Sequence, residues 1–575
     1  MLQKKCGNRT EISGGHFMRF KADFFRSLLL AFAALVFAFL CALLALCLFK
    51  AVLPAFSFDS IFKTQASSAS VLPHAQTAQI AQISRLARIA RVAFFTLFQA
   101  LASLFVAVLI GLPMAFFCGR RRFFGRKFLL SLSSVPLCVP TLIVALGYIT
   151  FFGNAGFLNK FFMAVFDLEK PPFSFLYTFF GLVVAQGFYN FPLVMSTVSD
   201  AWARLPSEQA DSARLLGAGE WRIFRTVTVF ELMPSIVSAC IPVFVYCFFS
   251  FMMVLLFGGI GCSTLEVEIY QAARNTLDFK TAGILSMTET LIACAVVGFY
   301  VYLENKSKRQ KGILSGEISA LKPVQGFKEK YVFPALIFLV SLFFLAPIFS
   351  NLLNAFTSAS RFDTSRFYNF KRIFSSRSFF SSLRWTFLTA VSTGFLCVSA
   401  GFFYSVILRK SQRFCLKVAA MLPMAVSSIV TGFGLSLLFP RGNFLLLIFA
   451  QSALFWPMAF RQIFPYISKI PDAAVDAARI LSRSKIEIIF RICLPVCRRG
   501  ILSAFGFCFA MSAGDTSLPL VLSVPNFSTL SLFTYRLAGS YRFGESCAAG
   551  VVLAVLCAAM FSLAKCGNNG KGAER

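Results

Sequence analysis

Long apolar runs constrain this chain more than any other feature of its sequence. They lie at about 27–49, 92–117, 128–152, 176–199, 229–257, 282–303, 332–353, 384–408, 417–439, 443–465, 500–524 and 546–564. A helix that crosses the hydrocarbon core of a bilayer needs about 20 apolar residues, so the runs predict about twelve transmembrane helices joined by modest loops. The boundary between the ninth and tenth runs, around Pro440–Asn443, is the least distinct.

Composition argues against the commonest alternatives. Of the 575 residues, 58% are hydrophobic and 14% are charged, whereas soluble domains have about 45–50% apolar and about 25% charged residues. We therefore do not expect a water-soluble enzyme, and the chain is too apolar and too aromatic for disorder. The sequence predicts an all-α polytopic membrane protein without a large soluble domain.

The charge distribution predicts an orientation in the inner (cytoplasmic) membrane. A net charge of +31 would suggest nucleic acid in a soluble protein, but a nucleic-acid binder does not explain the spans. With the N-terminus inside, the inner segments hold 36 Lys and Arg residues and the outer segments 18, as expected for cytoplasmic loops. We expect both termini to be cytoplasmic. The run at 27–49 exceeds a signal-peptide core of about 7–15 residues, so we expect a retained helix.

Cysteine and histidine give no sign of a metal site or a cofactor. The 17 Cys are scattered, mostly through apolar segments, and none forms a C-x-x-C pair. With only His16 and His74 in the sequence, a Cys/His metal centre has almost no ligands available. A disulfide framework is not indicated either.

The two halves of the chain resemble each other. Residues 185–192 (AQGFYNFP) align with 450–457 (AQSALFWP) at an offset of 265. Upstream, Pro136 and Gly147 align with Pro423 and Gly434 at an offset of 287. The difference predicts a loop about 22 residues longer in the first half, near 154–175. Six helices per half keep the two copies parallel, and such a pseudo-two-fold arrangement predicts a pathway along the seam between the halves.

These features predict a division of the chain into two membrane domains. The expected segments are a cytoplasmic N-terminus at 1–26, a first transmembrane domain at 27–303 with a cytoplasmic loop at 200–228, a cytoplasmic linker at 304–331, a second transmembrane domain at 332–565 with a loop at 466–499, and a cytoplasmic tail at 566–575.

The two cytoplasmic loops carry the most informative motif. Each contains a proline, a short helical stretch with an Asp-x-Ala core, and a second basic and apolar helix. The stretches have apolar faces formed by Ala210, Ala213 and Leu216 in the first copy and by Val475, Ala478 and Leu481 in the second. A solvated loop with helical propensity does not explain why this apolar face is duplicated.

The loops resemble the E-A-A-x-x-x-G cytoplasmic loop of permeases of type I, binding-protein-dependent ABC importers. The motif positions are Asp211, Ser212, Ala213 and Gly217 in the first copy and Asp476, Ala477, Ala478 and Ser482 in the second. Asp replaces Glu in both copies, which keeps the charge. Ser482 replaces the glycine, so the second turn is either less tight or relies on serine hydrogen bonding.

The resemblance extends over nearly the whole chain, and three segments resemble one branch of this family in particular. Residues 251–279 and 512–550, together with FYNFP at 188–192, resemble the thiamine branch of these permeases. This implies that the solute is thiamine or a phosphate ester of it. The fused ferric-iron permeases are near relatives, so iron or another solute remains an alternative.

The family resemblance also implies partners. Each loop would form a coupling helix that sits in a groove of an ATPase subunit, so two loops imply two ATPase copies, and an extracytoplasmic binding protein would deliver the solute. The residues implied at the ATPase contact are Asp211, Ala213, Leu216, Gly217, Asp476, Ala478, Leu481 and Ser482. No Walker A motif occurs in the chain; Gly119, Gly125 and Arg126 have the wrong spacing. We therefore expect a transporter subunit rather than an enzyme.

Charged residues inside the predicted spans are few and suggest a pathway. Asp515 and Glu289 are the candidates for lining it, and Arg461 is a third charged residue within a span. Because thiamine is a cation, an acid or an aromatic face could stabilise it in transit. An ion-coupled secondary transporter remains the alternative from another class, although it should place more carboxylates or histidines in its helices.

Overall fold

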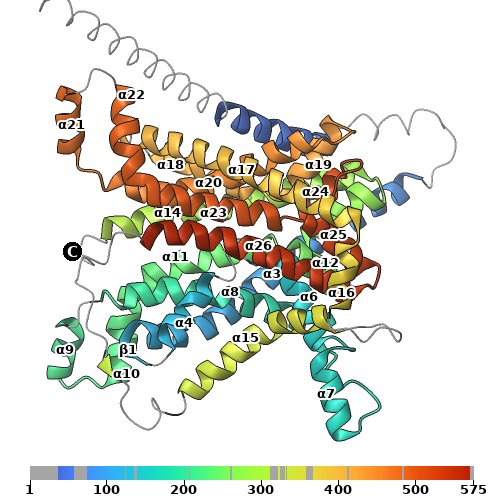
Figure 1. Cartoon of the computed structure of the whole chain (residues 1–575), viewed down its shortest axis with the longest axis horizontal. Helices are drawn as coiled ribbons and strands as arrows, with labels where there is room; N and C mark the ends of the chain where they lie inside the picture. The colour runs from blue at the N-terminus through green and yellow to red at the C-terminus, as the bar shows by residue number, and fades with distance from the viewer. Residues whose placement is uncertain are drawn as a thin grey trace, which may run out of the picture.

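The computed structural model describes residues 37–56, 74–123, 125–134, 139–205, 208–258, 262–310, 322–323, 331, 333–357, 367–410, 414–481 and 485–569. Within these ranges the chain is almost entirely helical, and the long helices run side by side along one direction (Figure 1). The N-terminal segment 1–26, most of the linker and the last residues of the tail lie outside the described ranges.

Ten of the described helical segments are long and apolar enough to cross a membrane. They contain α3 (His74–Arg120), α6 (Thr141–Phe152) with α7 (Phe157–Phe166), α8 (Phe179–Trp202), α11 (Val229–Phe248), α14 (Phe279–Gln310), α15 (Phe333–Phe356), α17 (Arg377–Lys410), α20 (Phe444–Ser468), α23 (Leu494–Gly514) and α26 (Phe543–Asn569). An eleventh candidate is bent by 85° between Ala419–Ala425 and Ser428–Leu438, and Phe37–Val52 forms a shorter apolar helix. The predicted all-α polytopic fold is confirmed.

Shorter elements connect the spans. They are α4 (Arg126–Ser131), α9 (Glu208–Leu215), α10 (Glu220–Ile223), α12 (Phe251–Phe257), α13 (Leu265–Tyr270), α16 (Tyr368–Phe374), α18 (Phe414–Met421), α19 (Ser428–Leu438), α21 (Asp472–Leu481), α22 (Lys485–Ile488), α24 (Ser517–Leu522) and α25 (Leu530–Gly539). Two residues of the linker form strand β2 (Lys322–Pro323), which pairs in parallel with β1 (Arg121–Arg122).

Four of the twelve apolar runs are each divided into two helices, where the sequence predicted one. The runs at 128–152, 229–257, 417–439 and 500–524 contain the breaks between α4 and α6, α11 and α12, α18 and α19, and α23 and α24. Pro140 immediately precedes α6, and Pro423 lies in the turn before α19. A proline inside a helix removes a backbone hydrogen bond and clashes with the preceding turn, which explains these two divisions.

The internal repeat is visible in the order and bounds of the helices. Thr141, at the start of α6, and Ser428, at the start of α19, differ by the predicted 287 residues. From the loops onward equivalent residues differ by about 265, and each loop contains a π-helical turn, at Phe224–Thr228 and at Ile489–Cys493. The additional residues of the first half contain α7, for which the second half has no counterpart.

Equivalent contacts recur in the two halves. Gly111 lets α3 approach Val194 on α8, and Gly401 lets α17 approach Ala459 on α20. In each half a threonine hydroxyl oxygen accepts a hydrogen bond from the first backbone N–H of a short helix. Thr96 does so for Leu265 at 3.0 Å, and Thr386 for Leu530 at 2.6 Å.

The first helix of each half packs against the other half. In the helix Phe37–Val52, the Phe37 ring lies 5.0 Å from the ring of Trp456 on α20. In α15, Phe343 contacts Phe152 of α6 at 4.9 Å, and Asn351 donates a 2.6 Å hydrogen bond to the carbonyl of Ile143. The two halves are therefore joined by helix packing as well as by the linker.

Candidate functional site

The two duplicated loops lie at the same end of the molecule, well apart from each other. Figure 1 shows α9 and α10 at the lower left and α21 and α22 at the upper left, beyond the ends of the long helices. Each loop contains a first short helix and a second short helix that continues through a π-helical turn into a span. We call these the first loop (208–228) and the second loop (472–493).

A glycine terminates the first helix of the first loop. Gly217 has a φ of 80°, in the left-handed region that favours glycine. The N–H of Gly217 donates to the carbonyl of Arg214, and the N–H of Ala218 donates to the carbonyl of Ala213. This pair of bonds is the Schellman arrangement, which satisfies carbonyls at a helix end. The motif glycine therefore sets the sharp turn between α9 and α10.

Ion pairs hold the first loop in shape. Arg214 contacts Asp211 at 2.5 Å and Glu220 at 2.6 Å, so it links α9 to α10 across the turn. The hydrogen bond to Glu220, together with the charges of both carboxylates, raises the pKa of Arg214 above its usual range. In the second loop Arg409, at the end of α17, contacts Asp472 at 3.0 Å and donates to the carbonyl of Ile470.

The loop residues that the motif predicted differ in their exposure to solvent. Asp211, Leu216, Gly217 and Asp476 are exposed, whereas Ala213 and Ala478 are half-buried. Ala210 and Val475, from the predicted apolar faces, are buried inside the protein. Leu481 is the last residue of α21, and Ser482 lies outside the described residues.

A second set of apolar loop residues points to solvent. Leu215 is 91% exposed, Leu216 88%, Trp221 74% and Ile480 87%. Of these, only Leu216 belongs to the faces predicted from the sequence. Leu215, Leu216 and Trp221 form an exposed apolar patch on the first loop, and Ile480 is an exposed apolar residue on the second loop. Exposed apolar surface of this kind commonly marks a protein contact.

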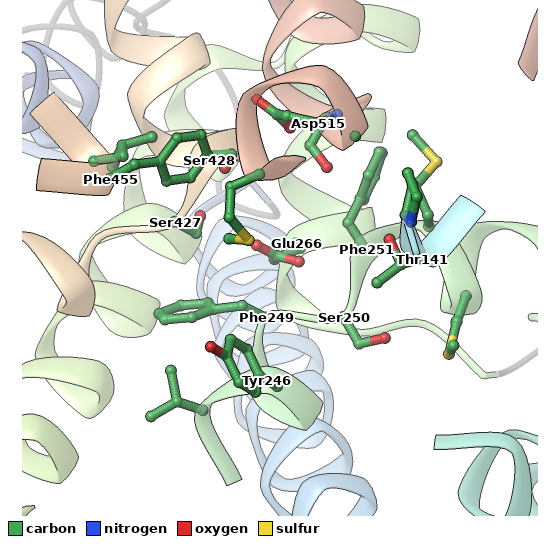
Figure 2. Close-up of a pocket in the computed structure, with 18 of the residues that line it drawn as sticks. Thr141, Tyr246, Phe249, Ser250, Phe251, Glu266, Ser427, Ser428, Phe455 and Asp515 are labelled. Atoms are coloured by element: carbon green, nitrogen blue, oxygen red, sulfur yellow. Dashed lines mark hydrogen bonds between the residues drawn. The ribbon is translucent and has the colours of Figure 1, made fainter. Parts of the chain in front are cut away.

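A cavity of about 240 Å³ lies between the two halves. Its polar lining includes Thr141, Gln186, Asn190, Ser250 and Glu266 from the first half and Ser427, Ser428, Asp515 and Ser517 from the second. Aromatic side chains complete the wall, among them Tyr246, Phe249, Phe251 and Phe455 (Figure 2). Residues from both halves thus meet at the seam where the repeat predicted a pathway.

Asp515 lines this cavity and also caps a helix. Its Oδ1 accepts hydrogen bonds from the N–H groups of Ser517 and Leu518, at 3.1 and 3.4 Å, at the start of α24. Its Oδ2 accepts one from Nε2 of Gln451 at 3.1 Å. The carboxylate is therefore held in place by three donors.

Glu266, which the sequence analysis did not single out, is the second acid of the cavity. It lies on α13, is 3% exposed, and its Oε2 has no hydrogen-bond partner. Glu289 on α14 is 1% exposed and also lacks partners for both oxygens, but it does not belong to the cavity lining. The structure thus brings Asp515 to the cavity and places Glu289 behind the wall, as a neighbour of Glu266.

Comparison with known proteins agrees with this two-domain arrangement. The chain matches the family described as binding-protein-dependent transport system inner membrane component at residues 107–307 and again at 395–566. The chain belongs to this family. It is therefore a multi-pass membrane permease with two copies of the domain in one polypeptide.

Several curated permeases are similar along most of their length. The thiamine transport system permease protein of Haemophilus influenzae is 24% identical over 488 residues, which cover 81% of this chain and 87% of that protein. The proteins of the same name from Escherichia coli and Brucella abortus are 25% and 26% identical, over 82% of this chain. The aligned residues cover 87% of the Escherichia coli protein and 86% of the Brucella abortus protein.

Sequence reasoning missed Glu266, Trp221 and Leu215. Glu266 occurs in the short segment LEVEIY, outside the long apolar runs in which intramembrane charges were sought. Trp221 and Leu215 lie next to motif positions, and helical periodicity alone did not establish which face of each short helix is free. Glu266 reaches the cavity through tertiary contacts of α13, such as the hydrogen bond from Leu265 to Thr96, which no local pattern encodes.

Proposed function

We propose that this permease is the transmembrane subunit of an ATP-driven importer that takes up thiamine or a phosphate ester of it. An extracytoplasmic binding protein delivers the solute, and two copies of a cytoplasmic ATPase subunit bind the first and second loops. The end with α9 and α21 then faces the cytoplasm, as do both termini. The predicted contact residues Asp211, Ala213, Leu216, Gly217, Asp476, Ala478, Leu481 and Ser482 belong to this proposal, which Leu215, Trp221 and Ile480 extend.

The observation that carries the proposal is exposed apolar surface at equivalent positions of the duplicated loops, Leu215 in the first and Ile480 in the second, which the offset of 265 relates. Both residues lie on short helices, α9 and α21, outside the long helices. Two equivalent docking surfaces fit two copies of one partner. The basic residues beside the loops, such as Arg121 and Arg122 of β1, agree with a cytoplasmic location.

Helix continuity provides a mechanism for coupling. In the first loop, α10 runs through the π-helical turn into α11 without a break, and the end of α11 contributes Val245 and Tyr246 to the cavity wall. In the second, α22 continues into α23, which contributes Ala510 and Met511. A movement of the docked ATPase subunits would thus shift both walls of the cavity, as alternating access requires.

The chemistry of the cavity supports thiamine as the solute. The named relatives are thiamine permeases, and the thiazolium ring of thiamine carries a permanent positive charge. The cavity offers carboxylates and aromatic side chains, which suit an organic cation. Its volume lies just below the range of about 300–1,000 Å³ that is typical of small-molecule sites, so it suits a small solute.

Capture of the ATPase subunit tests the proposal. The permease in nanodiscs is incubated with the ATPase subunit, and the bound ratio is measured for the wild type and for the double variant Leu216→Arg/Ile480→Arg. We expect two ATPase subunits per wild-type permease and none on the double variant, because an added charge prevents apolar docking. Leu168→Arg, at an exposed leucine after α7, is the matched control and should bind as the wild type does. Equal binding by all three proteins would refute the assignment of the loops.

A further inference from the structure

The central cavity is acidic although the chain as a whole is strongly basic. Among the described residues that line it, Glu266 and Asp515 are acidic and none is Lys, Arg or His. The full sequence has 55 Lys and Arg against 24 Asp and Glu. A cleft lined by one sign of charge and walled by apolar groups focuses its field, so this cavity attracts cations and repels anions.

The two acids differ in how their oxygens are used. Asp515 accepts hydrogen bonds from Gln451, Ser517 and Leu518, which give it a structural role. Glu266 is buried at the cavity wall with Oε2 unpartnered. A buried carboxylate oxygen without a hydrogen-bond donor is costly. A cation inside the cavity would supply the partner that the protein does not.

Glu268, the other acid near Glu266 on α13, has its charge partner within the protein. Glu268, two residues further along α13, contacts Arg88 of α3 at 2.8 Å and lies outside the cavity lining. The positions at an offset of 265 from Glu266 and Asp515 are Ser531 and Ser250. The site therefore receives one acid from each half, at positions that the internal repeat does not relate.

Aromatic side chains surround the Glu266 carboxylate. Figure 2 shows Glu266 near the centre of the view, with Phe249 and Tyr246 below it, Phe251 beside it and Asp515 above. A carboxylate and aromatic faces together favour an organic cation with a spread charge. A small metal ion needs several convergent ligands, and the described part of the chain contains no group of three or more His, Cys, Asp or Glu able to hold one.

We propose that Glu266, together with Tyr246, Phe249 and Phe251, forms a binding site inside the membrane domain for a small organic cation. The inference rests on the proposed function, because it places the thiamine cation at this site during transport. The permease itself then recognises the charge of its solute, in addition to any selection by a binding protein.

Direct binding to the permease tests the site. The permease–ATPase complex in nanodiscs, without binding protein, is titrated with radiolabelled thiamine and with thiochrome, the uncharged oxidation product of thiamine. We expect Glu266→Gln to weaken thiamine binding at least tenfold, about 1.4 kcal/mol, and to leave thiochrome binding unchanged. Glu268→Gln, which removes a charge from the same helix, should bind thiamine as the wild type does, and Glu266→Asp should recover much of the affinity.

The possible failures can be told apart. If the wild type does not bind thiamine, or if Glu266→Gln binds it equally well, the site is refuted. The proposed function is judged separately, by thiamine uptake into proteoliposomes containing the complete wild-type transporter and its binding protein. If Glu266→Gln does not fold, as judged by its melting temperature, Phe249→Leu replaces it. That variant should weaken thiamine binding at least threefold, and unchanged binding would equally refute the site.

Discussion

A β-carbon on Gly434 would lie 2.8 Å from the carbonyl carbon of Cys47, so the helix Phe37–Val52 crosses α19 in direct backbone contact. The equivalent glycine of the first half, Gly147, meets the backbone of Pro347 in α15 in the same way. These are the two glycines that the repeat aligned at an offset of 287. Their repetition has a physical reason, because each half needs a position without a side chain where the other half's first helix crosses.

The crossing predicts the effect of a small substitution. Gly434→Ala should lower the stability of the permease by about 1–3 kcal/mol, the usual cost of overpacking, and Gly147→Ala should do the same. Gly298→Ala is the control, because a β-carbon at this position on α14 meets nothing within 4 Å, so it should be neutral or slightly stabilising. Thermal unfolding in detergent measures all three. Equal melting temperatures would contradict the backbone contact.

The turn of the first loop predicts a separate effect on docking. Gly217→Ala places a β-carbon at a φ of 80°, which costs about 1–2 kcal/mol and should loosen the angle between α9 and α10. We expect ATPase binding to weaken about five- to thirtyfold, with the transmembrane core unchanged. Gly219→Ala, at a φ of −68° and also without close neighbours, should bind normally. A shared phenotype of the two variants would exclude the left-handed turn as the cause.

A continuous helix joins the first loop to the cavity, which predicts that a substitution can abolish solute transport without abolishing ATPase binding. Arg225→Pro interrupts the π-helical turn between α10 and α11, because proline removes a backbone hydrogen bond and clashes with the preceding turn. The variant should still capture the ATPase subunit but lose solute uptake, as measured in proteoliposomes. Arg225→Ala keeps the helix and should transport at close to the wild-type rate. Full transport by the proline variant would show that the continuous helix is not needed.

The sequence predicted the parts of this permease that repeat or that need a fixed length of apolar residues. Apolar runs indicated the spans, and two offsets related the halves and located the additional segment that contains α7. Local patterns could not predict the crossing of the first helices, because Cys47 and Gly434 are far apart in the sequence. Likewise, nothing near Glu266 indicates that its oxygen has no partner, whereas nearby Glu268 is paired with Arg88.

The packing of the helix Phe37–Val52 against the second half has a consequence for biosynthesis. The surface around Gly434 that receives the helix Phe37–Val52 is made 387 residues after Cys47, which at about 5–20 residues per second corresponds to roughly 20–80 s of translation. During that interval the face of the helix that later contacts Gly434 is covered by lipid or by a helper protein in the membrane. Correct assembly of the first half therefore waits for the ribosome to complete the second.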